Sequence, residues 1–300
     1  MSMNPINILI SYAYLGKDKA LCKKAFDMVE QGKIKLMIDS GAFSCFNNPS
    51  SFAHVTLENY ITFLKYYGSL SEKYVMLDVI GEKEKSVANY ERMISAGLAP
   101  MYVVIMADND FDYINQTLSV NQNICVAGGA TNKNDWMVHR FQQVKEKTNR
   151  KALIHGLGYF TFPKMLQLNL TSVDSSSWKM APSGFGQTIY FDEKKVYRIS
   201  KEKFFDDLTE EKKSFLRKHK ILPADIKNKE NQQSDGSVFS FLSRLKILQL
   251  QRYCKRHGLD YFFALCSKKD LDCLQMLNEN SDISYQEYKE YVKSYSQSNH

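Results

Sequence analysis

Three aspartates in this chain each end an apolar run and precede small or polar residues: Asp39, Asp78 and Asp174. A carboxylate at the carboxyl end of a parallel strand is where α/β barrel enzymes place catalytic groups. Asp174 is the most informative, because the polar residues Ser175–Ser177 follow it directly. An ionised carboxylate can attack an electrophilic carbon and later leave, which divides one difficult substitution into two easier steps. The sequence therefore predicts that several parallel strands place carboxylates at the same end of the fold, with Asp174 as the nucleophile.

Substitution at the anomeric carbon of a sugar is the chemistry that such a set could perform. Its transition state has oxocarbenium character, which a nearby anion stabilises. A second carboxylate must handle the proton of the departing or arriving group, and Asp39 and Asp78 are available for this. Two glycine turns, at Gly128-Gly129 and within His155–Gly158, would let a ligand approach the backbone closely.

The elements that must position these residues alternate regularly along the chain. Apolar, β-branched runs alternate with amphipathic segments, a rhythm typical of a parallel sheet with helices outside. The expected strands lie at residues 7–14, 35–39, 74–79, 101–106, 123–127, 152–155 and 171–173. Seven such units approach the eight of a closed barrel. We therefore predict an α/β fold, a TIM-type (β/α)8 barrel, with an open doubly wound sheet as the alternative.

Beyond Trp178 the pattern changes to a hairpin, charged helical segments and one more apolar run at 259–266, which could be the eighth strand. We predict three parts: a barrel core with the active site at 1–200, a helical insertion at 201–258, and the last strand with C-terminal helices at 259–300.

Composition bounds the setting. The chain has 300 residues, of which 44% are hydrophobic, so it can bury a substantial core. Its net charge of +7 permits a polyanionic partner, although a charge of this size more often reflects a solvated basic surface. Six scattered cysteines favour free thiols in a reducing compartment. No apolar stretch is long enough to cross a bilayer and the N-terminus lacks a cationic lead, so we expect a cytoplasmic protein with no membrane partner.

The order of the motifs resembles that of the guanine transglycosylases, enzymes that exchange guanine in a nucleic acid for a 7-deazaguanine. The resemblance covers roughly residues 8–200 and rests on Asp39–Phe43, Asp78, Gly128-Gly129, Gly156–Gly158 and Asp174 in sequence. The amino-acid sequences of Ile38–Ser44 and Ser172–Trp178 are most similar to those of the phage and bacterial branch that acts on DNA.

The resemblance implies a role for each matching residue. Asp174 would form the covalent bond to the sugar carbon, and Asp39 would act as acid and base. Substrate would be held by Ser40, Phe43, Asp78, Gly128, Gly129, His155 and Gly156. Among these, Phe43 would stack on the base, Asp78 would accept hydrogen bonds from the guanine edge, and His155 would line the pocket where the tRNA enzymes have a methionine.

Two departures from the tRNA enzymes favour DNA as the substrate. Their glutamine on the fourth strand is replaced by Ile105 and Met106, and their C-terminal zinc motif is absent. The set Cys254, His257, Cys266 and Cys273 suits no common zinc spacing, so we expect no metal and no cofactor.

Each residue also has an ordinary structural interpretation. Asp174 could cap a helix, Asp39 and Asp78 could shape turns, and Phe43 and His155 could belong to the core. Basic residues of the insertion could contact phosphates or form a solvated helix face; they are Lys212–Lys220, Arg244, Lys246, Arg252, Lys255 and Arg256.

We therefore expect an enzyme, a pentosyltransferase that replaces guanine in DNA by a 7-deazaguanine such as preQ0. The alternatives are the same reaction on tRNA, a catalytically silent nucleic-acid-binding barrel that works with a partner protein, and a hydrolase of small glycosides or nucleosides.

Overall fold

The computed structural model describes residues 4–104, 111–128, 134–200, 203–204, 209–227 and 235–297. The chain forms two compact units. The first, here called the barrel unit, comprises Met1–Ser175 and His257–Lys268. The second, here called the helical unit, comprises Ser176–Arg256 and Lys269–His300. The hairpin before residue 200, expected within the barrel core, belongs to the helical unit. The strand after residue 259, expected as the last barrel strand, belongs to the barrel unit.

Eight parallel strands form the sheet of the barrel unit. They are β1 (Ile6–Ser11), β2 (Ile34–Asp39), β3 (Lys73–Tyr74), β4 (Tyr102–Val104), β5 (Asn123–Ala127), β6 (Leu153–Leu157), β7 (Ser172–Ser175) and β10 (Asp260–Leu265). The order of the strands across the sheet is β3-β2-β1-β10-β7-β6-β5-β4. Strand β10 therefore pairs with both β1 and β7, and β3 and β4 form the two edges.

Backbone contacts between the segments of β3 and β4 join the two edges of the sheet. Val75 and Met101 form a parallel bridge. The Met101 N–H donates to the Tyr74 carbonyl at 2.9 Å, and the Met76 N–H donates to the Met101 carbonyl at 3.0 Å. The ring of eight strands is thereby complete, and the predicted TIM-type barrel is confirmed.

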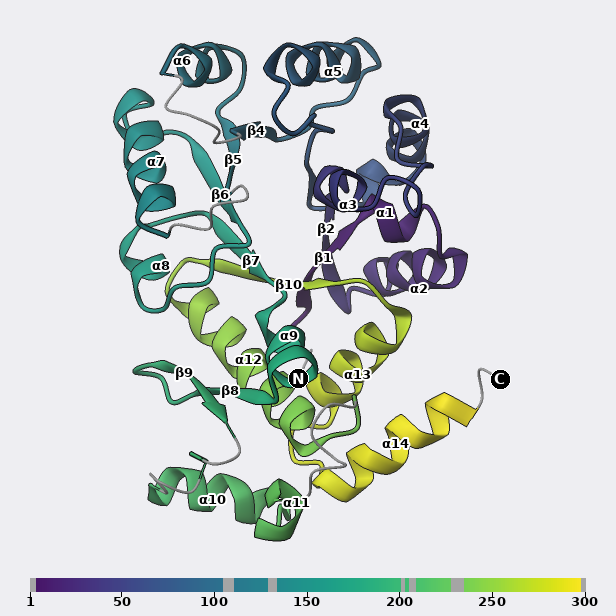
Figure 1. Cartoon of the computed structure of the whole chain (residues 1–300), viewed down its shortest axis with the longest axis vertical. Helices are drawn as coiled ribbons and strands as arrows, with labels where there is room; N and C mark the ends of the chain where they lie inside the picture. Colours follow the sequence, from purple (N-terminus) through teal and green to yellow (C-terminus); the bar gives the residue numbers. More distant parts are fainter. Residues whose placement is uncertain are drawn as a thin grey trace. The chain divides into compact units, whose positions relative to one another are not determined.

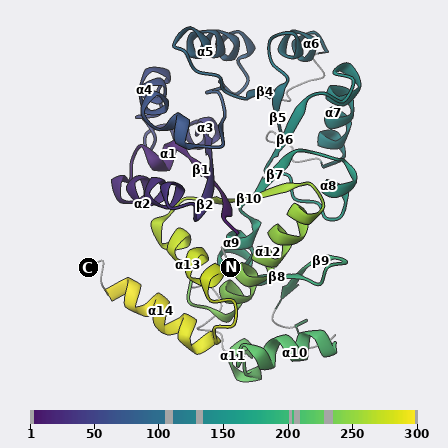
Figure 2. The same ribbon diagram turned by 180° about the vertical axis from the view of Figure 1, so that it is seen from behind.

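Helices follow the strands and lie outside the ring (Figures 1 and 2). They are α2 (Lys19–Glu30), α4 (Leu57–Tyr67), α5 (Lys83–Ser95), α6 (Phe111–Val120), α7 (Asn134–Lys147) and α8 (Lys164–Gln167). The sequence of α4 explains its position: Thr56 caps its first turn, and Tyr60, Ile61 and Leu64 recur at helical spacing and are buried.

Short helices occupy two of the turns after strands. The first expected strand was placed at 7–14, but β1 ends at Ser11, because the Ser11 hydroxyl accepts the Ala13 N–H and starts α1 (Tyr12–Leu15). After β2, Gly41 begins α3 (Ala42–Asn47). Helix α6 has no counterpart in the predicted elements.

The helical unit contains the antiparallel hairpin β8 (Gln187–Phe191) and β9 (Val196–Ser200). Its helices are α9 (Ser177–Phe185), α10 (Glu210–Lys218), α11 (Pro223–Lys227), α12 (Val238–Arg256), α13 (Lys268–Glu279) and α14 (Tyr285–Gln297). The helical character predicted for the region after residue 200 therefore agrees with the structure. No helix among the described residues has the length and apolar composition that crossing a membrane requires.

Helix α12 corrects one sequence-based interpretation. Arg244 and Lys246 were expected either on a solvated helix face or in contact with phosphates. Because they are only 1% and 2% exposed, the interpretation as a solvated face is wrong for both. The Arg244 guanidinium donates to the carboxylates of Asp235 and Asp270 and to the Tyr288 hydroxyl. A buried guanidinium needs such partners, and Arg244 is therefore a structural residue of the helical unit.

Candidate active site

The three aspartates lie close enough in the barrel unit to influence one another. Burial, and then the charge of Asp174, raise the pKa of Asp39 above its ordinary value. Burial, and then the charge of Asp39, raise the pKa of Asp78 to about 7. The pKa of the Cys125 thiol on β5 is raised first by burial and then by Asp39, Asp174 and Asp78. Strands that are far apart in sequence therefore bring these carboxylates to one region.

Asp174 on β7 is held by one oxygen. Its Oδ1 accepts the Gly158 N–H at 2.8 Å and lies 3.1 Å from Nε2 of His155. No hydrogen bond from a described residue reaches Oδ2, and the side chain is 8% exposed. Ser176 is the N-cap of helix α9, which begins at Ser177, so Asp174 does not cap it. A carboxylate with one oxygen anchored and the other available is suited to nucleophilic attack.

His155 on β6 connects Asp174 to a second residue of β7. Its Nδ1 lies 2.8 Å from the Ser172 hydroxyl, and the ring is fully buried. The tautomer that carries its proton on Nε2 satisfies both contacts, because the imidazole then donates to Asp174 and accepts from Ser172. Since Ser172 and Asp174 are two residues apart on one strand, both side chains lie on the same face. His155 thus orients Asp174.

Asp39 ends β2 and shapes the turn that follows it. Its Oδ2 accepts the Gly41 N–H at 3.1 Å, and contacts to Gly41, Ser11 and Ser40 partly counter the rise in its pKa. Gly41 has φ of +89°, and a Cβ there would lie 2.8 Å from both Ala13 Cβ and Ser11 Oγ. Only glycine fits this turn. The turn interpretation of Asp39 is therefore correct, and it is compatible with the proximity of Asp174.

Asp78 follows β3 and is partly buried. Among the described residues, only its own backbone N–H forms a hydrogen bond with its carboxyl group, whereas the N–H of its neighbour Val79 donates to the Ser86 hydroxyl at 2.9 Å. A carboxyl group in this state exists in both protonation forms near neutral pH. It can therefore accept a hydrogen bond from a ligand or donate one.

Phe43 does not belong to the core. It lies on α3, directly after the Asp39 turn, and 63% of it is exposed. An exposed ring next to a turn that carries a candidate catalytic carboxylate is available for stacking. Ser40, by contrast, is 1% exposed, and its hydroxyl accepts the Ala42 N–H at 3.4 Å. We assign Ser40 to the turn.

The predicted glycines separate into different roles. Gly128 ends the β5 segment and is partly buried, while Gly129 lies outside the described residues. A Cβ at Gly156 would lie 3.1 Å from Phe141 of α7 and 3.0 Å from Tyr159 Cβ. Packing explains why this position is a glycine, and the expected contact with substrate stays a prediction. Gly158, with φ of +66°, supplies the N–H that holds Asp174.

Sequence reasoning did not identify Ser172, Ser11 or the specific task of Gly158. The alternation of side chains along a strand could have paired Ser172 with Asp174. The contacts from β1 and from the loop after β6 depend on strand order, which no local pattern encodes. The replacements Ile105 and Met106 lie outside the described residues.

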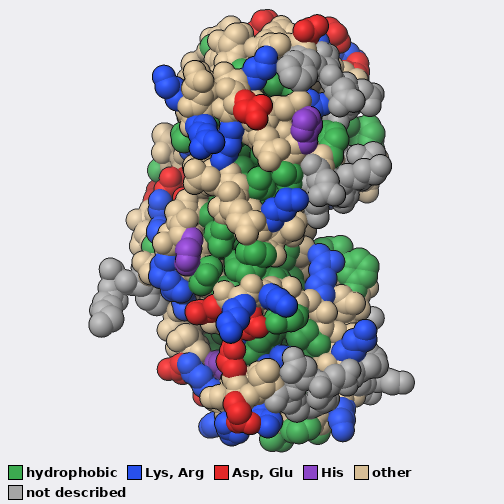
Figure 3. Space-filling model, turned by 90° about the vertical axis from the view of Figure 1, so that its left-hand side faces the viewer, with side chains coloured by type: hydrophobic (Ala, Val, Ile, Leu, Met, Phe, Trp, Pro, Cys, Tyr) green, Lys and Arg blue, Asp and Glu red, His purple; other side chains and the backbone are tan. Residues whose placement is uncertain are grey.

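The described residues contain no group of three or more His, Cys, Asp or Glu side chains arranged to hold a metal ion. The six cysteines are not joined in disulfides, and Cys254 and Cys273 are buried. On the face drawn in Figure 3, Lys and Arg side chains are interspersed with Asp and Glu. The basic side chains on that face therefore do not form a patch free of acidic side chains.

No family model and no curated protein matches the chain. Among solved structures, it is similar to a truncated form of 3-deoxy-D-arabino-heptulosonate 7-phosphate synthase from Thermotoga maritima. The TM-score is 0.42 and the identity 12%, over 98% of this chain and 86% of that chain. This likeness does not bear on the activity.

Proposed function

We propose that this protein is a base-exchange transglycosylase that replaces guanine in DNA by a 7-deazaguanine such as preQ0. The observation that carries the proposal is the convergence of Asp39, Asp78 and Asp174, with Asp174 anchored through one oxygen. The resemblance of the motifs to guanine transglycosylases supplies the identity of the reaction. Six cysteines outside disulfides are in keeping with a cytoplasmic setting, which belongs to this proposal.

In the first step, Oδ2 of Asp174 attacks C1′ of the target nucleotide. The C1′–N9 bond breaks, its electron pair stays with guanine, and Asp39 gives its proton to the departing base. The raised pKa of Asp39 supports this role, because the carboxyl group retains a proton to pH values at which an ordinary aspartate has lost it. The products are a covalent aspartyl-sugar ester and free guanine.

In the second step, ionised Asp39 takes the N9 proton of the incoming 7-deazaguanine, and N9 attacks C1′ and expels Asp174. Esterified Asp174 carries no charge, so the repulsion that raised the pKa of Asp39 is removed while Asp39 is ionised. The coupling of the two carboxylates therefore helps proton release in one step and proton uptake in the next.

Asp78 and Phe43 would hold the base. Stacking on an exposed aromatic ring contributes about 1–3 kcal/mol per base in single-stranded nucleic-acid sites. The target nucleotide must leave the helical stack, since C1′ and the glycosidic nitrogen are not accessible inside a duplex.

Asp174→Asn tests the proposal. Asparagine keeps an Oδ1 that can accept the bonds from Gly158 and His155, so the fold should persist while the nucleophile is lost. We expect incorporation of labelled 7-deazaguanine into DNA to fall by about 10³-fold or more, the scale of losing a covalent catalytic group. Asp27→Asn is the matched control, because the Asp27 side chain on α2 is 41% exposed, and this variant should retain full exchange.

The same assay with tRNA and with free nucleosides separates the alternatives. Exchange only on tRNA would replace the polymer in the proposal. Base release from free nucleosides without any polymer would indicate a hydrolase. Normal exchange by the Asp174→Asn variant would refute the mechanism.

A further inference from the structure

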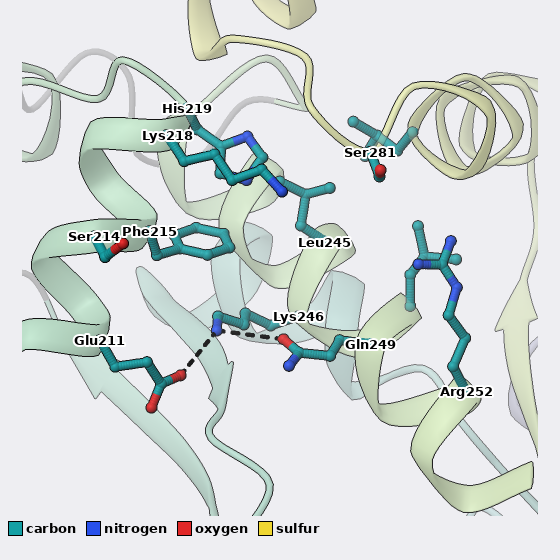
Figure 4. Close-up of a pocket in the computed structure, with 12 residues that line it drawn as sticks. Glu211, Ser214, Phe215, Lys218, His219, Leu245, Lys246, Gln249, Arg252 and Ser281 are labelled. Carbon is teal, nitrogen blue, oxygen red and sulfur yellow. Dashed lines mark hydrogen bonds and ion pairs between the residues drawn. The ribbon is translucent and has the colours of Figure 1, made fainter. Parts of the chain in front are cut away.

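A pocket of about 490 Å³ lies within the helical unit, between α10, α12 and the C-terminal end of α13 (Figure 4). Its charged lining consists of Lys218, Lys246, Arg252 and Glu211. Ser214 and Ser281 add hydroxyl groups, and Phe215 adds an aromatic ring. The volume is within the range of small-ligand sites. The cations exceed the anion among these side chains by two, so the lining favours an anionic ligand.

Lys246 forms the desolvated part of this lining. Its ammonium lies 4.0 Å from the ring centre of Tyr190 and 4.4 Å from that of Phe215. Its polar contacts are long, at 3.6 Å to Glu211 and 3.4 Å to Gln249. Charge-assisted hydrogen bonds of this kind are usually about 2.7–2.9 Å long. Burial lowers the pKa of Lys246, with Glu211 opposing this effect. A buried ammonium group whose hydrogen-bonding partners are all distant is stabilised when an anion approaches it.

Arg252 and Lys218 supply the exposed cations. One N–H group of the Arg252 guanidinium donates to the side-chain oxygen of Asn278 at 2.8 Å. Lys218 forms an ion pair with Asp282 at 2.7 Å, and 53% of the Lys218 side chain is exposed. Arg252 retains further N–H donors, because a guanidinium carries five. Figure 4 shows Lys218 and Arg252 coming from opposite sides of the pocket, with Lys246 between α10 and α12.

We propose that this pocket binds a phosphate group. A planar guanidinium, two ammonium groups and two hydroxyls match the several oxygens of a phosphate better than the two oxygens of a carboxylate. The phosphate could belong to a nucleic-acid backbone or to a small phosphorylated molecule, and the chemistry at the pocket is the same for both. The inference is independent of the barrel reaction, because every lining residue lies in the helical unit.

Titration of the full chain with inorganic phosphate and with a single-stranded oligothymidylate, at matched ionic strength, distinguishes the sources. Binding of both ligands indicates a small-phosphate site, and binding of the oligonucleotide alone indicates a backbone site. For whichever ligand binds, Arg252→Gln and Lys246→Met should each raise Kd about tenfold, as expected for losing one charge-assisted contact. Lys213→Gln, on α10, is the control, since Lys213 pairs with Glu210 and does not line the pocket.

An opposite-direction variant and a check of folding make the test decisive. Glu211→Gln removes the carboxylate that competes for Lys246 and should lower Kd. Lys246→Met keeps an unbranched side chain between the two rings, so thermal unfolding should show a folded protein; if it does not, Lys218→Gln and Arg252→Gln carry the test from exposed positions. The proposal is overturned if neither ligand binds, or if binding is the same in the Arg252, Lys246 and Lys213 variants. The Asp174→Asn variant should bind phosphate normally, so failure of base exchange and failure of this site can be told apart.

Discussion

Asp174 and Asp39 have the same side chain but different surroundings, and these differences suit the different roles that the proposed reaction gives them. Asp174 receives two donors on one oxygen, from a backbone N–H and from His155. Asp39 receives a backbone N–H as well, yet burial and the charge of Asp174 outweigh it and raise its pKa. The first environment favours an oriented anion, and the second favours a carboxyl group that exchanges protons.

His155 is expected to act on the reaction through Asp174. His155→Phe removes the Nε2 donor and should lower kcat for base exchange about 10–100-fold, the usual range for a residue that orients a reactive ligand or group. KM should change little, because the histidine does not bind the base in this scheme. His155→Gln places an amide donor near the position of Nε2 and should recover part of kcat. Equal activity of the two variants, or an unchanged kcat in both, would show that His155 only fills space.

Phe43 and Phe46 provide a comparison within one helix. Both are exposed on α3, by 63% and 60%, but only Phe43 occupies the position expected for base stacking. Phe43→Ala should raise KM for the incoming base about tenfold, which corresponds to losing part of a stacking contribution of 1–3 kcal/mol. Phe46→Ala should leave KM unchanged. Steady-state kinetics of both variants decide the point, and equal effects would contradict the stacking role.

At the scale of elements, the turn between β2 and α3 decides where Asp39 points. The left-handed conformation of Gly41 and its close approach to Ser11 and Ala13 lock this turn against the one after β1. The first two strands of the barrel therefore cooperate in placing one carboxylate.

Gly41→Ala should destabilise the protein by more than about 2 kcal/mol, since it combines a strained backbone with a steric clash. Gly32→Ala is the matched control: Gly32 also has a positive φ, of +66°, but a Cβ there would meet nothing within 4 Å. It should cost only about 1 kcal/mol. Urea denaturation of both variants measures the difference, and equal losses would mean that the close approach to β1 has no role.

At the scale of the whole molecule, the collected carboxylates link stability to pH. The native pKa of Asp78 is about 7, against an ordinary value of 3.8, so the native state binds more protons than the unfolded state between these pH values. Stability should therefore decrease as pH rises from about 4 to about 7, and this contribution should stay constant above that range. The raised pKa of Asp39 acts in the same direction.

Asp78→Asn should remove part of this pH dependence. The variant should be more stable than the native protein at pH 8, by about 1–2 kcal/mol because partial exposure screens the charge, and should lose the advantage near pH 4. Denaturation curves for both proteins across this range give the comparison. A constant difference at all pH values would show that Asp78 does not titrate as proposed.

The local sequence was enough to predict the barrel and to single out its three candidate aspartates. Apolar runs and amphipathic segments alternate with the periods of strands and helices, and these periods depend only on neighbouring residues. Asp39, Asp78 and Asp174 were recognisable because each ends such a run. The resemblance to a family added an order of motifs. Gly156 is packed closely and Ser40 holds its turn, and their expected contacts with substrate stay predictions.

Other features depend on contacts between distant parts of the chain, and only the tertiary structure decided them. Strand β10 pairs with β1 and β7 although a helical unit precedes it in the sequence, and His155 meets Asp174 because β6 and β7 are neighbours. Arg244 and Lys246 look like surface cations in the sequence, yet both are buried within the helical unit. Charge and periodicity describe a residue and its neighbours along the chain, whereas burial and pairing are set by the residues that folding brings to it.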